Sequence, residues 1–331
     1  MSFNGPPHAW HGYHEREHEG KHDMGKRSGE AVRNRNAETP PPAPEPLRVA
    51  VADSHTHMDM QGPDPAEVIA AAEAVGVTPL IQVGVDLPSS RWAAEIAAEH
   101  PAVYAAVALH PNEAPRIVHG DGAPGVEVDD TDWAGKLRPA GGAAALDEAI
   151  AEIDRLAALP RVRAVGETGL DYFRTGTEGV DAQQDSFRRH IAVAKRHGKA
   201  LMIHDREAHE DVLRILDEEG APDTVIFHCY SGDTEMAKVC AEHGYYMSFA
   251  GNVTFASAQG LRDAAAVAPA ELILVETDAP FLTPKPYRGR PNGPYLIPHT
   301  LRALAEARGA DEDELAARIA ENGRRAFRLD D

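Results

Sequence analysis

Short apolar segments alternate with amphipathic segments along most of the chain. The apolar segments begin near residues 49, 78, 102, 162, 200, 224, 245 and 272. They are almost continuously apolar, which is typical of strands that are buried on both faces of a parallel sheet. Helical periodicity fills the intervals at residues 64–76, 89–100, 146–159, 181–197, 207–219, 234–243 and 257–267. About eight strands with intervening helices predict a (β/α)8 barrel of the TIM type.

Two helices carry clear start signals. Asp64-Pro65-Ala66-Glu67 is a capping box with proline at the first helical position, and the helix that it opens is expected to end near Gly76. A second capping box, Asp311 to Glu314, predicts the start of the final helix.

Two segments break the alternation. Residues 1–46 contain five histidines and the proline-rich run TPPPAPEP with almost no apolar periodicity, so we expect a disordered tail followed by the barrel domain at 47–331. The irregular spacing of these histidines favours weak metal capture at most. Residues 116–145 are rich in glycine, alanine and acids and predict a long surface loop, an acidic insertion with seven acids against two bases between Asp121 and Glu148.

The amino-acid composition is typical of a globular protein and argues against a membrane-spanning one. The 331 residues include 43% hydrophobic residues, enough for a large core, and no apolar run approaches the roughly 20 residues that span a bilayer. The amino terminus lacks the apolar segment of a signal peptide, so we expect a soluble cytoplasmic protein without a membrane partner. Cys229 and Cys240 are expected to be reduced thiols.

The net charge of −20 argues against nonspecific binding of nucleic acid through a cationic surface. Residues 1–46 carry six basic and seven acidic residues, so about −19 of the charge belongs to the predicted barrel. A polyanionic substrate therefore requires a local basic pocket or bound metal ions.

The segment VAVADSHTHMD at 49–59 places two histidines after an apolar strand. Side chains alternate along a strand, so His55 and His57 share one side and can bind one cation together. Further ligand-type residues follow four other predicted strands: Glu167, His204, His228 and Asp278. The carboxyl ends of barrel strands meet at one mouth, so we expect all six side chains to converge there.

The ligand types indicate the chemistry. Four imidazoles and two carboxylates suit Zn²⁺, Mn²⁺ or Ni²⁺, whereas a pure Mg²⁺ site is ordinarily richer in oxygen; the identity of the metal stays open. Six ligands exceed the three protein ligands of a single catalytic zinc, which favours two divalent ions with one bridging carboxylate. Such a pair activates water for hydrolysis, for example of a phosphodiester. Ser231 and Ser248 are weaker nucleophile candidates because no dedicated base accompanies either.

The order of the motifs resembles the TatD family of metal-dependent hydrolases, within the amidohydrolase-like barrels. The matching segments within residues 49–328 are DSHTHMD, LHPNEA, VGETGLDY, IHDREA, FHCYSG, ETDAPFLTP and YRGRPN. The resemblance implies a metal-dependent deoxyribonuclease, often a 3′-to-5′ exonuclease on single-stranded DNA. It also implies that His55, His57, Glu167 and Asp278 hold one metal and that Glu167 bridges to a second metal on His204 and His228. Asp278 would accept a proton from the attacking water.

Three positions depart from the family's usual motifs. They are Thr168, Ala108 and Gly293, and none is an expected metal ligand.

Other residues are candidates for contact with substrate. His110 ends the third strand and faces the same mouth, so it is assigned, with Glu167 and Asp278, to catalysis, through contact with a scissile phosphate; the alternative is that it supports a metal ligand. Arg206 is expected to bind a phosphate oxygen or, alternatively, a neighbouring carboxylate, and Arg288, with Arg290 beside it, lies in a loop suited to a substrate backbone.

Three aromatic residues flank the expected ligands: Tyr172, Tyr230 and Phe281. Each is a candidate for stacking on a base, with packing in the core as the alternative.

Two other functions stay open. The same metals serve hydrolysis of another ester or amide bond, such as D-aminoacyl-tRNA deacylation, since fold alone does not choose the substrate. A noncatalytic partner-binding barrel is disfavoured because all six expected ligands are present. The oligomeric state is not predicted.

Overall fold

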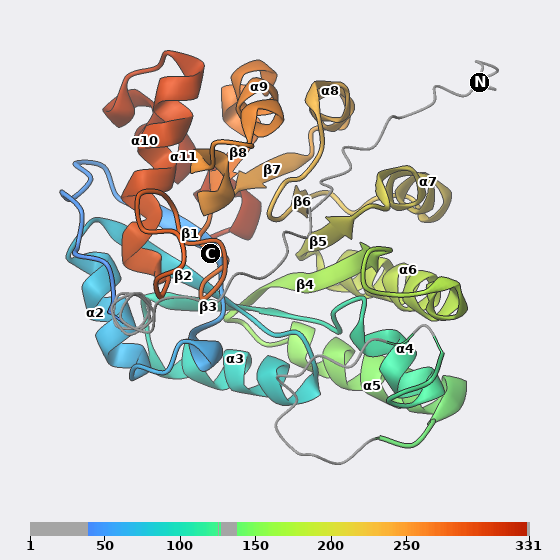
Figure 1. Ribbon diagram of the computed structural model, residues 1–331. Helices are drawn as coiled ribbons and strands as arrows, with labels where there is room; N and C mark the ends of the chain where they lie inside the picture. The colour runs from blue at the N-terminus through green and yellow to red at the C-terminus, as the bar shows by residue number, and fades with distance from the viewer. Residues whose placement is uncertain (1–38, 125, 127–137, 330–331) are drawn as a thin grey trace, which may run out of the picture. The chain divides into compact units, whose positions relative to one another are not determined.

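A computed structural model describes residues 39–124, 126 and 138–329. Eight parallel strands pair in the order in which they occur along the chain, from β1 to β8, and helices surround them (Figure 1). The strands are β1 (Val51–Thr56), β2 (Val77–Val83), β3 (Val103–Val107), β4 (Val162–Asp171), β5 (Ala200–Arg206), β6 (Val225–Phe227), β7 (Tyr246–Phe249) and β8 (Ile273–Val275). The predicted (β/α)8 barrel is confirmed.

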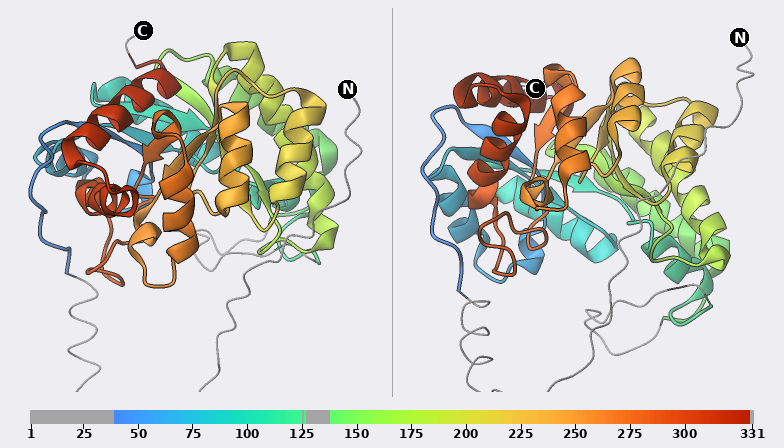
Figure 2. Two further views of the ribbon diagram at one scale, coloured as in Figure 1. Left: turned by 90° about the horizontal axis from the view of Figure 1, so that it is seen from above. Right: turned by 45° about the horizontal axis from the view of Figure 1, so that its top comes forward.

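The helices follow the strands around the barrel and cover its outside (Figure 2). They are α2 (Pro65–Glu73), α3 (Leu87–Glu99), α4 (Glu113–His119), α5 (Gly142–Ala157), α6 (Val180–His197), α7 (His209–Glu219), α8 (Thr234–His243), α9 (Gln259–Val267), α10 (Ile297–Arg308) and α11 (Glu312–Phe327). Asp64 and Asp311 are the N-caps of α2 and α11: Asp64 accepts a hydrogen bond from the Ala66 N–H, and Asp311 accepts from the N–H groups of Asp313 and Glu314. These bonds form the aspartate half of each expected capping box.

Two apolar clusters stabilise the barrel. The larger cluster packs strand side chains against the helices and includes Phe187 of α6. The smaller cluster joins alternate residues from several strands, among them Ile81, Met202 and Leu274, with Phe327 of α11. Side chains on a strand alternate between two faces, so the smaller cluster is the filled interior of the barrel.

Hydrogen bonds between the segments after β1 and β8 close the barrel at its mouth. The Asp278 N–H donates to the carbonyl oxygen of His55 (2.9 Å), and the His57 N–H donates to that of Ala279 (2.9 Å). The buried carboxylate of Asp53 accepts from the N–H groups of Thr277 (3.0 Å) and His55 (3.2 Å). Asp278 is thereby brought beside His55 and His57, which lie more than two hundred positions earlier in the sequence.

A buried histidine fixes the end of β3. His190 Nε2 accepts from the Leu109 N–H (3.1 Å), and its Nδ1 donates to the Ser186 carbonyl (2.7 Å). Burial lowers the pKa of His190 to about 4, so the ring is neutral at pH 7 and suited to this paired role. The backbone just before His110 is therefore held by α6.

Two helices were not expected. Helix α10 follows the proline-rich loop, and α4 follows β3 although it contains Pro115. The loop prediction for 116–145 was wrong at both ends, because residues 116–119 belong to α4 and residues 142–145 belong to α5. Arg138 pairs with the buried Glu113 of α4, an attraction that local periodicity does not reveal. Residues 125 and 127–137 of the expected acidic insertion lie outside the described residues.

The described chain begins earlier than the predicted boundary at residue 47. The side chain of Arg290 donates to the carbonyl oxygens of Thr39 (2.8 Å) and Pro40 (2.6 Å), and Tyr295 donates to that of Pro41 (2.9 Å). Residues 39–46 therefore lie against the barrel. The rest of the expected tail, residues 1–38, lies outside the described residues. Among the residues that are described, no helix has the length and apolar character needed to cross a membrane.

Candidate metal centre

The structure brings the six expected ligands together at the mouth. His55 lies in β1 and His57 directly follows it. Glu167 lies in β4 and His204 in β5, while His228 follows β6 and Asp278 follows β8. All six side chains are buried or partly buried.

The first donor group consists of His55, His57, Asp278 and one oxygen of Glu167. The Nε2 atoms of the two histidines lie 3.0 Å apart. Glu167 Oε1 lies 3.6 Å from His55 Nε2 and 3.4 Å from His57 Nε2. Asp278 Oδ1 lies 3.6 Å from each of these two nitrogens. Four potential ligand atoms thus surround one point.

The second donor group consists of His204, His228 and the other oxygen of Glu167. Glu167 Oε2 lies 2.9 Å from His228 Nε2 and 3.2 Å from His204 Nδ1. The two imidazole nitrogens are 3.4 Å apart. The rings of His55 and His228 stack with centroids 3.9 Å apart, so the two donor groups adjoin each other and share Glu167.

These separations fit metal binding. Ligand atoms about 2.1 Å from a tetrahedral ion lie about 3.4 Å from one another. The distances between ligand atoms within the two groups, 2.9 to 3.6 Å, include that value. Imidazole and carboxylate are also the donors that zinc and manganese prefer. Both donor groups are therefore capable of holding a divalent ion.

The far nitrogens of the imidazoles have partners that fix ring orientation. His57 Nδ1 donates to the Val83 carbonyl (3.1 Å), and His55 Nδ1 lies 3.1 Å from Met202 Sδ. His204 Nε2 lies 3.2 Å from an oxygen of Asp171, and His228 Nδ1 lies 3.2 Å from Glu276 Oε1. Such carboxylates orient a ligand ring and raise its basicity.

Asp171 and Glu276 were missed in the sequence. Both stand in segments that match the family, GLDY and ETDAP, and Glu276 is two residues from Asp278 along an extended chain. The feature of the sequence that could have identified them is an acidic residue a few positions from an expected metal ligand. Its role depends on contact with His204 or His228, which the local pattern does not show.

Charge interactions set the protonation of the carboxylates. Burial alone would raise the pKa of Glu167, but the imidazoles of His228 and His55 lower it well below its ordinary value. For Asp278, burial is again outweighed, in this case by the hydrogen bond with His57. The same two carboxylates raise the pKa of His57 to about 9 against the effect of burial. Both acids are thus ionised at pH 7, the form in which carboxylates bind metal.

His110 lies beside the second donor group. Its Nε2 is 3.3 Å from His204 Nδ1 and 3.9 Å from Glu167 Oε2. Burial and the neighbouring His204 lower the pKa of His110 to about 3, so the ring is neutral. Its Nδ1 accepts from the Asn112 N–H (3.1 Å), which leaves the proton on Nε2, facing the site.

Asp171, His110 and His204 also lie close enough together to hold a metal. However, Asp171 already accepts from the N–H groups of Phe173 (3.1 Å) and Arg174 (2.9 Å) and from the side chain of Asn112 (3.2 Å). We therefore interpret Asp171 as the group that orients His204.

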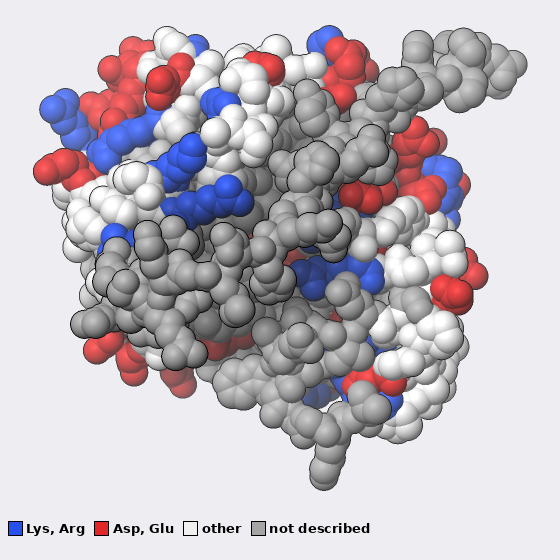
Figure 3. Space-filling view, in the orientation of Figure 1, with Lys and Arg blue, Asp and Glu red and all other residues white. Residues whose placement is uncertain are grey.

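The arginines expected to contact substrate lie over aromatic rings. Arg206 Cζ is 3.9 Å from the centroid of Phe173, and Arg288 Cζ is 4.5 Å from that of Phe255. Neither guanidinium makes an ion pair with a described carboxylate, and Asp205, the alternative partner of Arg206, binds His209 instead (2.7 Å). In the face viewed in Figure 3, some Lys and Arg side chains lie inward of the edge, whereas most Asp and Glu side chains lie toward it.

The aromatic candidates separate by exposure. Tyr230 is buried in the core, whereas Phe281 is 53% exposed. The Tyr172 hydroxyl donates to Asp211 (2.7 Å) and is partly buried. The two serine candidates bind elsewhere, Ser248 to Ser54 (2.8 Å) and Ser231 to the Asp205 carbonyl (3.0 Å).

Replacing Asp171 by alanine is expected to weaken metal binding about 10- to 100-fold, because His204 loses the acceptor on its far nitrogen. Titration of metal-free protein with Zn²⁺, followed by calorimetry, measures this change. Asp311→Ala is the matched control, since Asp311 Oδ1 also accepts two backbone N–H bonds but lies at α11. Equal affinities for the two variants would contradict the orienting role.

A (β/α)8 barrel with clustered histidines and carboxylates at the carboxyl ends of its strands has the architecture of the metal-dependent hydrolases. Residues 52–328 match the family model described as TatD related DNase. The chain belongs to this family and is a metal-dependent hydrolase of the TatD type.

Individual relatives agree with this assignment. The chain is 44% identical over 266 residues to the uncharacterized metal-dependent hydrolase TatD of Mycobacterium tuberculosis, covering 79% of this chain and 90% of the relative. It is 31% identical over 271 residues to the 3′-5′ ssDNA/RNA exonuclease TatD of Citrobacter rodentium, covering 80% of this chain and 92% of the relative. Among solved structures, YJJV, a TatD homolog from Escherichia coli, matches with a TM-score of 0.70 and 25% identity, covering 84% of this chain and 98% of the other.

Proposed function

We propose that the protein is a deoxyribonuclease that removes nucleotides from the 3′ end of single-stranded DNA with the aid of two divalent metal ions. The observation that carries this proposal is the position of Glu167, which directs one carboxylate oxygen to each donor group. The family description and the name of the Citrobacter relative support nucleic acid as the substrate.

The residues divide into two sets around Glu167. His55, His57 and Asp278 would hold one ion, and His204 and His228 the other, with Glu167 shared. When bound, such a pair supplies an activated water and positive charge beside the phosphate oxygens. Zn²⁺ and Mn²⁺ fit this donor set well, and Ni²⁺ and Mg²⁺ are to be tested with them.

Protein groups supply the remaining chemistry. The Asp278 side chain is 14% exposed against 5% for Glu167, so it is the more accessible carboxylate for a proton released by the attacking water. The Nε2–H of His110 can donate to a phosphate oxygen. Arg206 and Arg288 can pair with phosphates farther along the strand.

The test compares which bonds the protein hydrolyses in different substrates. With Mn²⁺ or Zn²⁺ present, we expect the protein to shorten a 5′-labelled single-stranded oligonucleotide stepwise from its 3′ end. A D-aminoacyl-tRNA and a simple aryl ester serve as the competing substrates. Release of D-amino acid without any phosphodiester cleavage would overturn the nuclease proposal in favour of deacylation.

A further inference from the structure

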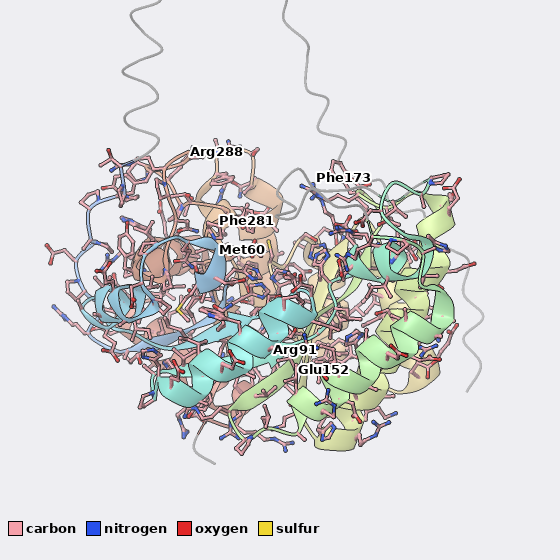
Figure 4. The ribbon with its side chains drawn as sticks, turned by 90° about the horizontal axis from the view of Figure 1, so that it is seen from below. Met60, Arg91, Glu152, Phe173, Phe281 and Arg288 are labelled. Carbon is pink, nitrogen blue, oxygen red and sulfur yellow. The ribbon has the colours of Figure 1, made fainter. Side chains whose placement is uncertain are left out.

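Exposed apolar side chains concentrate around the metal centre. Among the described residues, five large hydrophobic side chains are exposed: Met60, Leu159, Phe173, Val267 and Phe281. Met60, Phe173 and Phe281 lie on segments that follow the carboxyl ends of β1, β4 and β8, whereas Leu159 follows α5 and Val267 is the last residue of α9, both at the opposite end. Figure 4 shows the first three toward one end of the barrel. Apolar surface gathered at a site indicates a binding role.

One side of the mouth carries Met60 and Phe281. The Met60 N–H donates to the His57 carbonyl (3.1 Å), and the Phe281 N–H donates to the Asp278 carbonyl (2.8 Å). The Phe281 ring centroid is 6.3 Å from that of His57. Both exposed side chains are thus held by the backbone of expected metal ligands.

The other side carries Phe173, which is 58% exposed. Its N–H donates to Asp171, the residue that orients His204. The preceding residue, Tyr172, donates its N–H to the Arg206 carbonyl (3.0 Å), so the Phe173 ring and the guanidinium above it come from adjoining strands. This side of the mouth is therefore also fixed to the metal centre.

Each side combines an aromatic face with a cation. Figure 4 shows Arg288 near Phe281 and Met60, and Phe173 across from them. In a chain of net charge −20, these arginines have no described carboxylate partner but lie over the rings of Phe173 and Phe255. Aromatic faces beside cations are the elements with which proteins bind single-stranded nucleic acid without reading its sequence.

We propose that unpaired bases of the substrate strand stack on Phe281 and on Phe173, on opposite sides of the metal centre, while Arg206 and Arg288 bind the intervening phosphates. This inference rests on the proposed nuclease function and specifies its substrate class. Bases in a duplex are already stacked and paired, so their faces are not available to these rings. The two aromatic residues therefore determine the preference for an unpaired 3′ end over a blunt duplex.

The experiment compares Phe281→Ala and Phe173→Ala with the wild-type holoenzyme. The substrates are a single-stranded DNA 12-mer, the same 12-mer with abasic residues at its last three positions, and bis(p-nitrophenyl) phosphate. Because stacking of a base contributes to the binding free energy, we expect KM for the 12-mer to be about 10-fold higher or more in the alanine variants, with kcat nearly unchanged. On the abasic strand and on bis(p-nitrophenyl) phosphate, the variants should equal the wild type.

Matched controls are Leu159→Ala and Val267→Ala, which remove exposed apolar side chains, 42% and 52% exposed, from the far end of the barrel. Phe281→Trp and Phe173→Tyr, which keep an aromatic ring at each position, should have the wild-type KM for the 12-mer. Unchanged KM in both alanine variants, or an equal loss on the abasic strand, would overturn the stacking proposal. If the wild type cleaves bis(p-nitrophenyl) phosphate but no oligonucleotide, the nuclease proposal itself fails, and the stacking proposal fails with it.

Discussion

Replacing Glu167 by alanine is expected to lower kcat/KM about 1,000-fold or more. Glu167 directs Oε1 toward the first donor group and Oε2 toward the second, so its loss would remove one carboxylate oxygen from each group at once. Stabilisation of charge by metal ions contributes several kcal/mol to a transition state, and about 4 kcal/mol corresponds to about 1,000-fold in rate. Steady-state hydrolysis of bis(p-nitrophenyl) phosphate measures the effect.

The control for this variant is Glu113→Gln. Glu113 is also buried, but it pairs with Arg138 instead of the imidazoles, so activity should stay within a few-fold of the wild type. Circular dichroism should show the same helical content for both variants. Normal turnover by folded Glu167→Ala would contradict the two-ion proposal. Asp278→Asn, a change confined to the first donor group, provides an independent check.

Removing the metal is expected to abolish activity and to destabilise the fold. Four imidazoles and two carboxylates converge in a buried space, and an ion that binds only the folded state stabilises it by RT ln(1 + [L]/Kd), or about 4 kcal/mol at 1,000 times Kd. Dialysis against a chelator, followed by thermal unfolding with and without added Zn²⁺ or Mn²⁺, tests this. Elemental analysis of the loaded protein should find two ions per chain.

The same titration on Glu167→Ala provides the comparison. The stabilisation by added metal should be much smaller in this variant, because neither donor group is complete. Full activity in the chelated protein, or one ion per chain at saturation, would contradict the two-ion centre.

Much of the fold could be predicted from local patterns. Strands such as VRAVGE and KALMIH are mostly apolar and lie between helices with clear periodicity, so both the element type and the parallel arrangement could be predicted. Helix α4 was not, because Pro115 interrupts its sequence and the pairing of Glu113 with Arg138 bridges 25 positions. The position of the chain near Thr39 likewise depends on distant residues of the loop that contains Arg290.

Some features of the candidate site could likewise be predicted from the sequence, and others could not. His55 and His57 could be assigned to one side of a strand, because alternation is a property of the extended backbone. The exposure of Phe173 and Phe281, in contrast to buried Tyr230, could not be deduced from residue type. The left-handed backbone of Asp278, with φ of +51°, was equally hidden, since such a conformation in a non-glycine residue requires support from the surrounding structure.

By itself the sequence determined the eight strands, most of the helices and the residue types capable of binding metal, because hydrophobic periodicity and donor chemistry are properties of short segments. Only the tertiary structure decided the distances between those donors and the contacts by which Asp171 and Glu276 hold His204 and His228. The physical reason is closure of the barrel. Hydrogen bonds between the segments after β1 and β8, together with the lateral pairing of the other strands, convert sequence separations of up to 223 positions into distances of a few ångströms.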